Sequence, residues 1–120
     1  MKVLIPILSE NDGPEFIKEA SESAKEIVLL LVIDAAPNQR FGFTTSQISR
    51  AQKAIQDAKK LIGKKKKIEE VEEWGDTPTK IRNTALLKNV KKIVMKTQHN
   101  QLFETLVDKL RREKFEVELL

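Results

Sequence analysis

The sequence predicts an α/β domain in which a parallel sheet is layered by helices. Five short apolar runs alternate along the chain with four stretches whose apolar residues recur at helical spacing. The runs are Val3–Leu8, Ile27–Ile33, Ile68–Val71, Ile93–Met95 and Phe115–Leu120. Strands that alternate with helices and are joined by right-handed crossovers form a parallel sheet covered on its faces. At 120 residues, we expect residues 1–120 to form a single domain.

The first two helices have recognisable ends. Asp12 is a plausible N-cap for the first, and Glu15, three residues later, completes a pair that resembles a capping box. The second helix is predicted over Ser46–Ile62, with Gly63 in the C-cap position. We place the strand between these helices, which is the most hydrophobic segment, in the interior of the sheet.

The second half of the chain is more charged. Glutamates fill the strand predicted over Lys67–Glu73, which is typical of a sheet edge, because charge discourages pairing with other edges. Trp74 follows it, and we expect its side chain to cap the core. The third helix is predicted to begin with Thr77 as N-cap and Pro78 at the first helical position. The fourth is predicted over Asn100–Arg112.

Composition excludes several classes of protein. The chain has no cysteine, so disulfides and thiolate catalysis are ruled out. The longest apolar run, Ile27–Ile33, is far short of the roughly 20 residues that a membrane span needs. We therefore expect a soluble cytoplasmic protein with no membrane partner. Charged residues make up 33% of the chain, and their Lys and Glu enrichment is typical of a thermophilic source.

The net charge of +4 does not predict a nucleic-acid surface. Much of the excess lies in Lys64–Lys67, but four glutamates follow within six residues. A nucleic-acid surface presents a patch of one sign, whereas here the signs are interleaved. We favour a solvated turn and strand rim; binding through these lysines would show steep salt dependence.

Three stretches together resemble the universal stress protein family over nearly the whole chain. Lys2-Val3-Leu4-Ile5-Pro6-Ile7 is similar to the family's opening strand, Gly75-Asp76-Thr77-Pro78 to its turn into the third helix, and Lys92-Ile93-Val94-Met95 to its fourth strand. The resemblance implies a doubly wound, five-stranded parallel sheet of order 3-2-1-4-5 with helices on both faces. This fold is of the adenine nucleotide alpha hydrolase-like, or Rossmann-like, type.

Many members of that family bind a nucleotide, and here the sequence departs from them. The family usually has Asp-Gly-Ser after its first strand, where this chain has Leu8-Ser9-Glu10. ATP-binding members carry three glycines after the fourth strand, but no glycine follows Gly75 in this chain. A phosphate cradle needs glycines so that main-chain N–H groups can approach the anion. The resemblance is therefore to the subtype that lacks the ATP signature.

Any ligand site is expected at the carboxyl ends of the first and fourth strands, where the order of the strands reverses. Acidic side chains at the first helix, namely Glu10, Asp12 and Glu15, would repel a triphosphate. Lys96 could pair with Glu10 or Asp34 and neutralise the crevice without a ligand. The candidate site residues are Ser9, Glu10, Asp34, Lys96, Thr97, His99 and Asn100.

Other uses of these residues are less favoured. His99 is the only histidine, and a metal site would need Asp34, Glu10 and Asp12 to converge on it. Ser9, His99 and Asp34 could form a hydrolytic triad, but no nucleophile-elbow motif surrounds Ser9. Phe41 and Phe43 either cover a flat ligand or pack onto the end of the sheet or onto a partner subunit, and we favour packing.

The function predicted from this pattern is regulatory or protective, without a catalytic or metal site and without a cofactor. The family resemblance suggests a homodimer through the last strand, with Phe115, Val117 and Leu119 at the interface, or action on an unknown protein partner. Glu116 and Glu118 would repel their symmetry mates unless Lys114 of the partner intervenes. The alternative is a sensor of ATP, AMP or a small anion. Lys96, Thr97 and Asn100 would then contact the anion, with Phe41 or Phe43 over the base.

Overall fold

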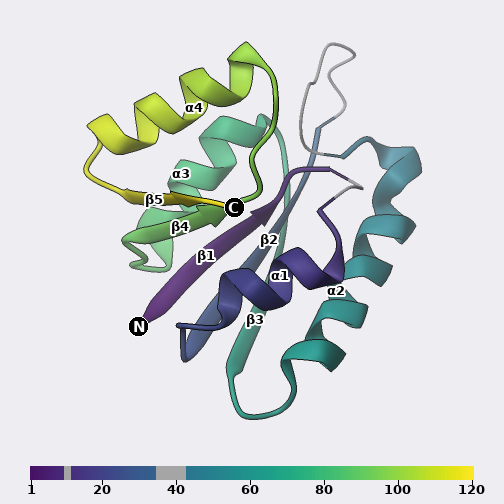
Figure 1. Cartoon of the computed structure of the whole chain (residues 1–120). Coiled ribbons are helices and arrows are strands. Elements are labelled where there is room, and N and C mark those ends of the chain that lie inside the picture. The colour runs from purple at the N-terminus through teal and green to yellow at the C-terminus, as the bar shows by residue number, and fades with distance from the viewer. Residues whose placement is uncertain (10–11, 35–42) are drawn as a thin grey trace.

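The computed structural model describes residues 1–9, 12–34 and 43–120. Strands and helices alternate along it as the sequence predicts (Figure 1). The strands are β1 (Lys2–Ile7), β2 (Glu26–Ile33), β3 (Lys67–Trp74), β4 (Lys92–Met95) and β5 (Glu116–Leu119). The helices are α1 (Pro14–Ser21), α2 (Ile48–Ile62), α3 (Thr77–Leu87) and α4 (Gln101–Arg112), and a short 3₁₀ turn, Thr45–Gln47, precedes α2.

The five strands form one parallel sheet in the order β3-β2-β1-β4-β5, which confirms the order that the family resemblance implied. β1 pairs with β2 from Lys2↔Glu26 to Ile7↔Leu31. On its other side β1 pairs with β4, where Leu4 lies opposite Ile93. The chain therefore winds outward from β1 in both directions, and the switch point lies between β1 and β4.

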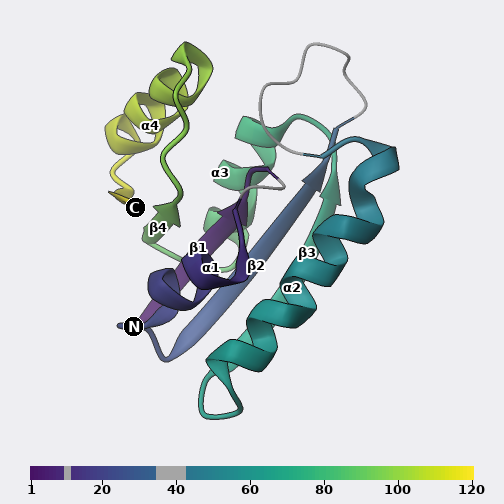
Figure 2. The same cartoon turned by 45° about the vertical axis from the view of Figure 1, so that its right-hand side comes forward.

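Two hydrophobic layers hold the helices to the sheet, and Figure 2 shows the helices divided between its faces. Side chains alternate across a strand, so Val3, Ile5 and Ile7 point to one face and Leu4 to the other. The first face packs against α1 and α2 through residues such as Ile17 in α1 and Ile55 in α2. The second packs against α3 and α4 through Ile81, Ala85, Phe103, Leu106, Val107 and Leu110.

Helix ends agree with the sequence at one point and correct it at another. Gly63 ends α2 with a φ of 83°, a left-handed conformation that glycine adopts without strain, so its predicted C-cap role is confirmed. The predicted N-cap of α3 is wrong by one residue. Asp76 is the cap, because its carboxylate accepts the main-chain N–H of Thr79 at 3.0 Å. Pro78 consequently occupies the second helical position.

The charged strand β3 lies at the sheet edge, as predicted, and its glutamates are matched from both faces. Side chains of α2 meet those on one face, and side chains of α3 or the residue that follows it meet those on the other. The pairs are Lys59–Glu70 at 2.8 Å, Lys88–Glu69 at 2.8 Å, Lys80–Glu73 at 4.0 Å and Gln52 donating to Glu72 at 3.0 Å. Such half-exposed pairs each contribute little, but together they mark the edge with charge.

Two aromatic residues differ in burial from each other. Phe43 is buried at 1% exposure in the layer under α1 and α2, so it packs onto the end of the sheet as predicted. Its main chain bridges to β2, since its N–H donates to Val32 O at 3.0 Å and its O accepts from Asp34 N at 2.8 Å. Trp74 is 54% exposed, so the prediction that it caps the core is wrong. Phe41 lies outside the described residues.

Candidate functional site

The candidate site lies where β1 and β4 end beside each other. Ser9 follows β1, Lys96 and Thr97 follow β4, and Asp34 follows β2. This is the switch point at which parallel α/β sheets usually bind ligands. Glu10 lies outside the described residues.

The buried carboxylate of Asp12 bridges the two strand ends. Its Oδ2 accepts the main-chain N–H of Leu8 at 2.8 Å, and its Oδ1 accepts the Ser9 hydroxyl at 3.1 Å. The same Oδ1 accepts Gln98 Nε2 at 3.2 Å, and Gln98 Nε2 also donates to Lys96 O at 3.1 Å. Asp12 is 1% exposed. Protein groups therefore link the β1 and β4 connections across the crevice.

This bridge corrects the predicted role of Asp12. We expected Asp12 to cap α1 and Glu15 to complete the pair, but the residue at the N-cap is Gly13, with no side-chain hydrogen bond. The Asp12 carboxylate turns back to the end of β1 instead, because the N–H of Leu8 is buried there and needs an acceptor. A buried donor left without a partner costs about 1–3 kcal/mol, which exceeds the typical ~1 kcal/mol of an N-cap.

The environment of Asp12 is costly for its charge. Burial raises the pKa of the Asp12 carboxyl above its ordinary value of 3.8. The hydrogen bonds from Leu8, Ser9 and Gln98 and the positive charge of Lys96 act in the opposite direction but do not cancel the effect of burial. Burial therefore destabilises the ionised form of Asp12, and the hydrogen bonds that its carboxylate accepts offset only part of this cost.

We expect Asp12→Asn to change how stability depends on pH. Because the pKa of Asp12 is raised on folding, the folded state takes up the proton more readily than the unfolded chain. The resulting stabilisation is full below the unfolded pKa and is lost as pH rises through the folded pKa. The free energy of unfolding of the wild type, relative to that of Asp12→Asn, should therefore increase as pH falls from about 7 to about 4. Urea unfolding at several pH values measures this, and parallel pH profiles would contradict it.

Lys96 lies on the α1 side of the strand ends. Its ammonium is 5.8 Å from the centre of the Phe16 ring, close enough for a cation–π contact. It also lines a hollow of about 460 Å³ beside Gly13, Pro14 and Glu15. We expected Lys96 to pair with Glu10 or Asp34. In the described part of the chain, its ammonium group lies near the Phe16 ring, and its positive charge stabilises the ionised carboxylate of Asp12. Lys96 therefore already compensates part of a negative charge inside the protein.

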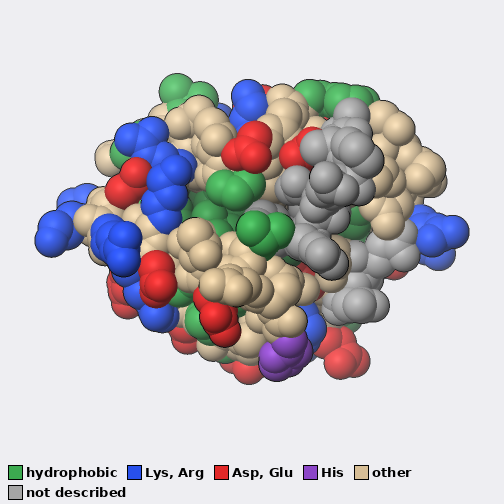
Figure 3. Space-filling model, turned by 90° about the horizontal axis from the view of Figure 1, so that it is seen from above, with side chains coloured by type: hydrophobic (Ala, Val, Ile, Leu, Met, Phe, Trp, Pro, Cys, Tyr) green, Lys and Arg blue, Asp and Glu red, His purple; other side chains and the backbone are tan. Residues whose placement is uncertain are grey.

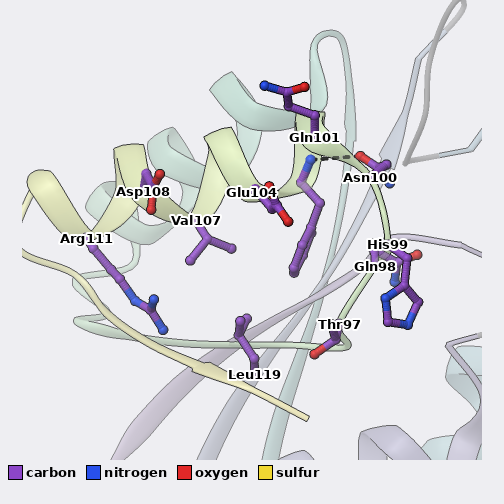
Figure 4. A pocket seen from close by; sticks show the side chains of 11 residues that line it. Thr97, Gln98, His99, Asn100, Gln101, Glu104, Val107, Asp108, Arg111 and Leu119 are labelled. Carbon is purple, nitrogen blue, oxygen red and sulfur yellow. Dashed lines mark hydrogen bonds between the residues drawn. The ribbon is translucent and has the colours of Figure 1, made fainter.

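Thr97, His99 and Asn100 line a different pocket, between α4 and β5 (Figure 4). Successive side chains of an extended segment point to opposite sides, so the side chain of Thr97 points away from the side on which Lys96 lies. The pocket holds about 540 Å³. Figure 4 shows Val107 and Leu119 facing each other across it, whereas Gln101 points away. The structure therefore divides the predicted site into two parts.

The groups around this pocket do not favour a polyphosphate. Asn100 Oδ1 accepts the N–H of Phe103 at 2.8 Å, so Asn100 is the N-cap of α4 and not, as predicted, the first residue of the helix. Glu104 and Asp108 place two carboxylates on the α4 rim. Arg111, in the last turn of the same helix, donates its Nη2 to Val117 O at 3.1 Å. An anion entering here would meet two like charges and one engaged guanidinium.

The described residues do not support the metal and triad alternatives. No group of three or more His, Cys, Asp or Glu side chains in the described ranges could hold a metal ion. The Ser9 hydroxyl donates to Asp12, and His99 lines the pocket beside α4. These positions leave both residues with structural or surface roles.

The predicted interface residues lie on β5, but their side chains face the protein's own core. Val117 is buried, and Phe115 and Leu119 pack against the same layer under α4. Main-chain groups of Glu116 and Leu120 bond to β4, as Glu116 N to Lys91 O at 2.8 Å and Leu120 N to Met95 O at 3.0 Å. Because ladder bonds alternate along a strand, the N–H and C=O groups of Val117 and Leu119 point to the outer edge.

Two residues of this region are not among the predicted site residues. Gln98 bridges to Asp12, 86 positions earlier, and Arg111 bonds to the outer carbonyl of Val117. Neither contact follows from local spacing. Gln98 does lie in the segment after β4 that the switch-point rule marks, which is the one signal that could have found it.

Comparisons with known proteins support the fold alone. No protein-family model matches this chain, and no curated protein matches it. Among solved structures, the crystal structure of the hypothetical protein PH0823 is similar, with a TM-score of 0.64 and 20% sequence identity. The match covers 98% of this chain and 92% of that one. In the described part of this chain, no helix is long and apolar enough to cross a membrane.

Proposed function

We propose that this chain is a non-catalytic regulatory module of the universal stress protein type that does not use its switch-point crevice to hold ATP. One observation carries the proposal: Asp12 and Gln98 bond to each other across the ends of β1 and β4, at 3.2 Å. A nucleotide at this place would have to displace a buried carboxylate that also satisfies the N–H of Leu8. The doubly wound sheet of order 3-2-1-4-5 agrees with the family resemblance.

We propose further that the module acts by association, as a homodimer through β5 or on a protein partner. In the described part of the chain β5 pairs only with β4, so the outer N–H groups of Val117 and Leu119 and the C=O of Leu119 face away from the sheet and could bond a second strand, whereas the C=O of Val117 already accepts from Arg111. The repulsion expected from Glu118 is reduced within each chain. Lys92 Nζ lies 3.1 Å from the Glu118 carboxylate, so a lysine of the same chain already offsets part of this charge, besides any contribution from Lys114 of a partner.

Adding nucleotide is expected to leave the melting temperature of the protein unchanged, because we expect no binding. A site with a dissociation constant of about 10 µM would, at about 1 mM nucleotide, stabilise the fold by about 2.7 kcal/mol. In a domain of this size that is a rise of about 10 °C. In a thermal-shift assay we expect ATP or AMP to raise the melting temperature by less than about 1 °C. We also expect mass spectrometry of the natively purified protein to show no co-purifying nucleotide. A large, saturable rise in melting temperature would contradict the proposal that the crevice between β1 and β4 is closed by the bond between Asp12 and Gln98.

The second candidate function, a nucleotide or small-anion sensor, is favoured by one feature. Thr97 and His99 do line a pocket, although it lies between α4 and β5 and not between β1 and β4. If ATP or a small anion raised the melting temperature and Thr97→Ala or His99→Ala removed the rise, the sensor would replace the first proposal. Asn100 is unsuitable for this test because its side chain caps α4.

A further inference from the structure

The fold gathers positive charge at the edge where all five strands begin. We call this the amino edge and define it as Lys2 and the connections 22–26, 63–67, 88–92 and 113–116. These described residues carry ten lysines and four glutamates, a charge of +6, while the whole chain carries +4. Figure 3 views the molecule from the top of Figure 1, at the end where the strands finish, and there Lys and Arg side chains lie among Asp and Glu side chains.

This charge exceeds what the helices need. All four helices end at the amino edge, and each helix C-terminus carries about half a negative charge, so about two positive charges compensate them. Some lysines are also engaged: Lys2 donates to Lys88 O at 2.9 Å, and Lys66 donates to Glu22 O at 2.9 Å. Lys88 and Lys92 pair with Glu69 and Glu118.

The remaining lysines of the amino edge are exposed. In the described part of the chain no ion pair holds Lys25, Lys64, Lys65, Lys67, Lys91 or Lys114. Lys60 and Lys64 also border a hollow of about 680 Å³ at the end of α2, with Ile68 on its wall. The amino edge therefore offers exposed ammonium groups, and Lys64 places one of them beside a concave, partly apolar surface.

Large apolar side chains are exposed beside these lysines. Leu86 and Leu87, in the last turn of α3, are 56% and 79% exposed. Leu61, in the last turn of α2, is 46% exposed. Leu61 lines the hollow that Gly13, Pro14 and Lys96 border, so the exposed apolar side chains nearest the amino-edge lysines in sequence are Leu86 and Leu87, which precede Lys88.

We propose that the amino edge docks on a bilayer surface that contains anionic phospholipids. Lysines are attracted to the lipid phosphates, and exposed leucines beside them can enter the boundary between headgroups and acyl chains. A nucleic-acid backbone would satisfy the lysines but offers nothing apolar to Leu86 and Leu87. The proposal departs from the expectation of no membrane partner, which rested on the absence of a spanning segment. It is independent of the proposed function, because the amino edge lies opposite the crevice.

Vesicle co-sedimentation of the full chain tests this. The probes are vesicles of phosphatidylcholine alone and of phosphatidylcholine with about one-third phosphatidylglycerol, whose surface charge attracts lysine. We expect binding to the anionic vesicles only. Leu86→Ser with Leu87→Ser should weaken it about tenfold, because the inserted apolar surface is lost. Lys64→Ala with Lys65→Ala should weaken it by about tenfold or more.

Two matched variants serve as controls. Leu102→Ser replaces a leucine that is 50% exposed in the first turn of α4, at the opposite end of the sheet. Lys53→Ala removes an exposed lysine from the first half of α2. Both should leave vesicle affinity within about twofold of the wild type. All substituted side chains are exposed, and circular dichroism melting checks that each variant folds.

Three outcomes would overturn the proposal. They are no binding to anionic vesicles, equal binding to both kinds of vesicle, and binding that the paired leucine substitution leaves unchanged. In the last case the edge would be a purely electrostatic surface. Steeply salt-dependent binding to duplex DNA, again insensitive to Leu86 and Leu87, would then assign it to nucleic acid.

Discussion

Replacing Phe43 by alanine is expected to lower the free energy of unfolding by about 3–5 kcal/mol. The ring is fully buried in the layer under α1 and α2, and its main chain is fixed to the end of β2 on both sides. Alanine would leave a cavity that these fixed surroundings cannot fill by collapsing. Urea unfolding followed by circular dichroism measures the loss.

Trp74→Ala is the matched control for Phe43→Ala. Trp74 is the larger aromatic residue, but more than half of its side chain is exposed at the edge of the sheet. We expect its loss to cost no more than about 1 kcal/mol. If Phe43→Ala cost as little, the ring would not be a core residue, and its other role as a cover for a flat ligand would have to be reconsidered.

Leu119→Pro is expected to convert a β5-mediated dimer into a monomer. The N–H of Leu119 points to the outer edge of β5, so proline removes a donor that β4 does not use. Two-fold symmetry doubles the loss to two hydrogen bonds, about 2 kcal/mol, which raises the dimer dissociation constant by about 30-fold. Sedimentation equilibrium at micromolar concentration measures this change.

Leu119→Ala separates the main chain from the side chain in this experiment. Alanine keeps the outward N–H while removing the contacts of Leu119 with the layer under α4. We expect it to dimerise more tightly than Leu119→Pro, although it lowers stability. A wild-type chain that is monomeric at micromolar concentration, or a proline variant that dimerises as well as the alanine variant, would exclude a homodimer through this edge.

The sequence was sufficient for the architecture because local patterns and tertiary layers agree. Apolar runs such as Ile27–Ile33 are covered on both faces, while the glutamates between Ile68 and Val71 belong to an edge strand. In a parallel sheet with helices on both faces, a fully apolar run fits an interior strand and a glutamate-rich run fits an edge strand. Gly63 was identified as a C-cap for a similar reason, since few other residues adopt its backbone conformation without strain.

The candidate site was less predictable because side-chain contacts over long distances decide it. Asp12 has the sequence context of an N-cap, yet the buried N–H of Leu8 takes its carboxylate. Lys96 and Thr97 are neighbours in sequence, but an extended backbone sends them to opposite sides. Rules for strand ends therefore find the right region and do not show which side chains share one cavity.

The measurement that bears most directly on the closed crevice is an NMR titration of the ¹⁵N-labelled chain with ATP. Main-chain signals of Leu8, Ser9 and Asp12 report one side of the crevice, and the side-chain amide of Gln98 reports the other. We expect no saturable shift of these signals up to millimolar nucleotide, and a Gln98 amide that stays bonded to Asp12. Saturable shifts on both sides at once would mean that ATP opens the bridge and occupies the crevice.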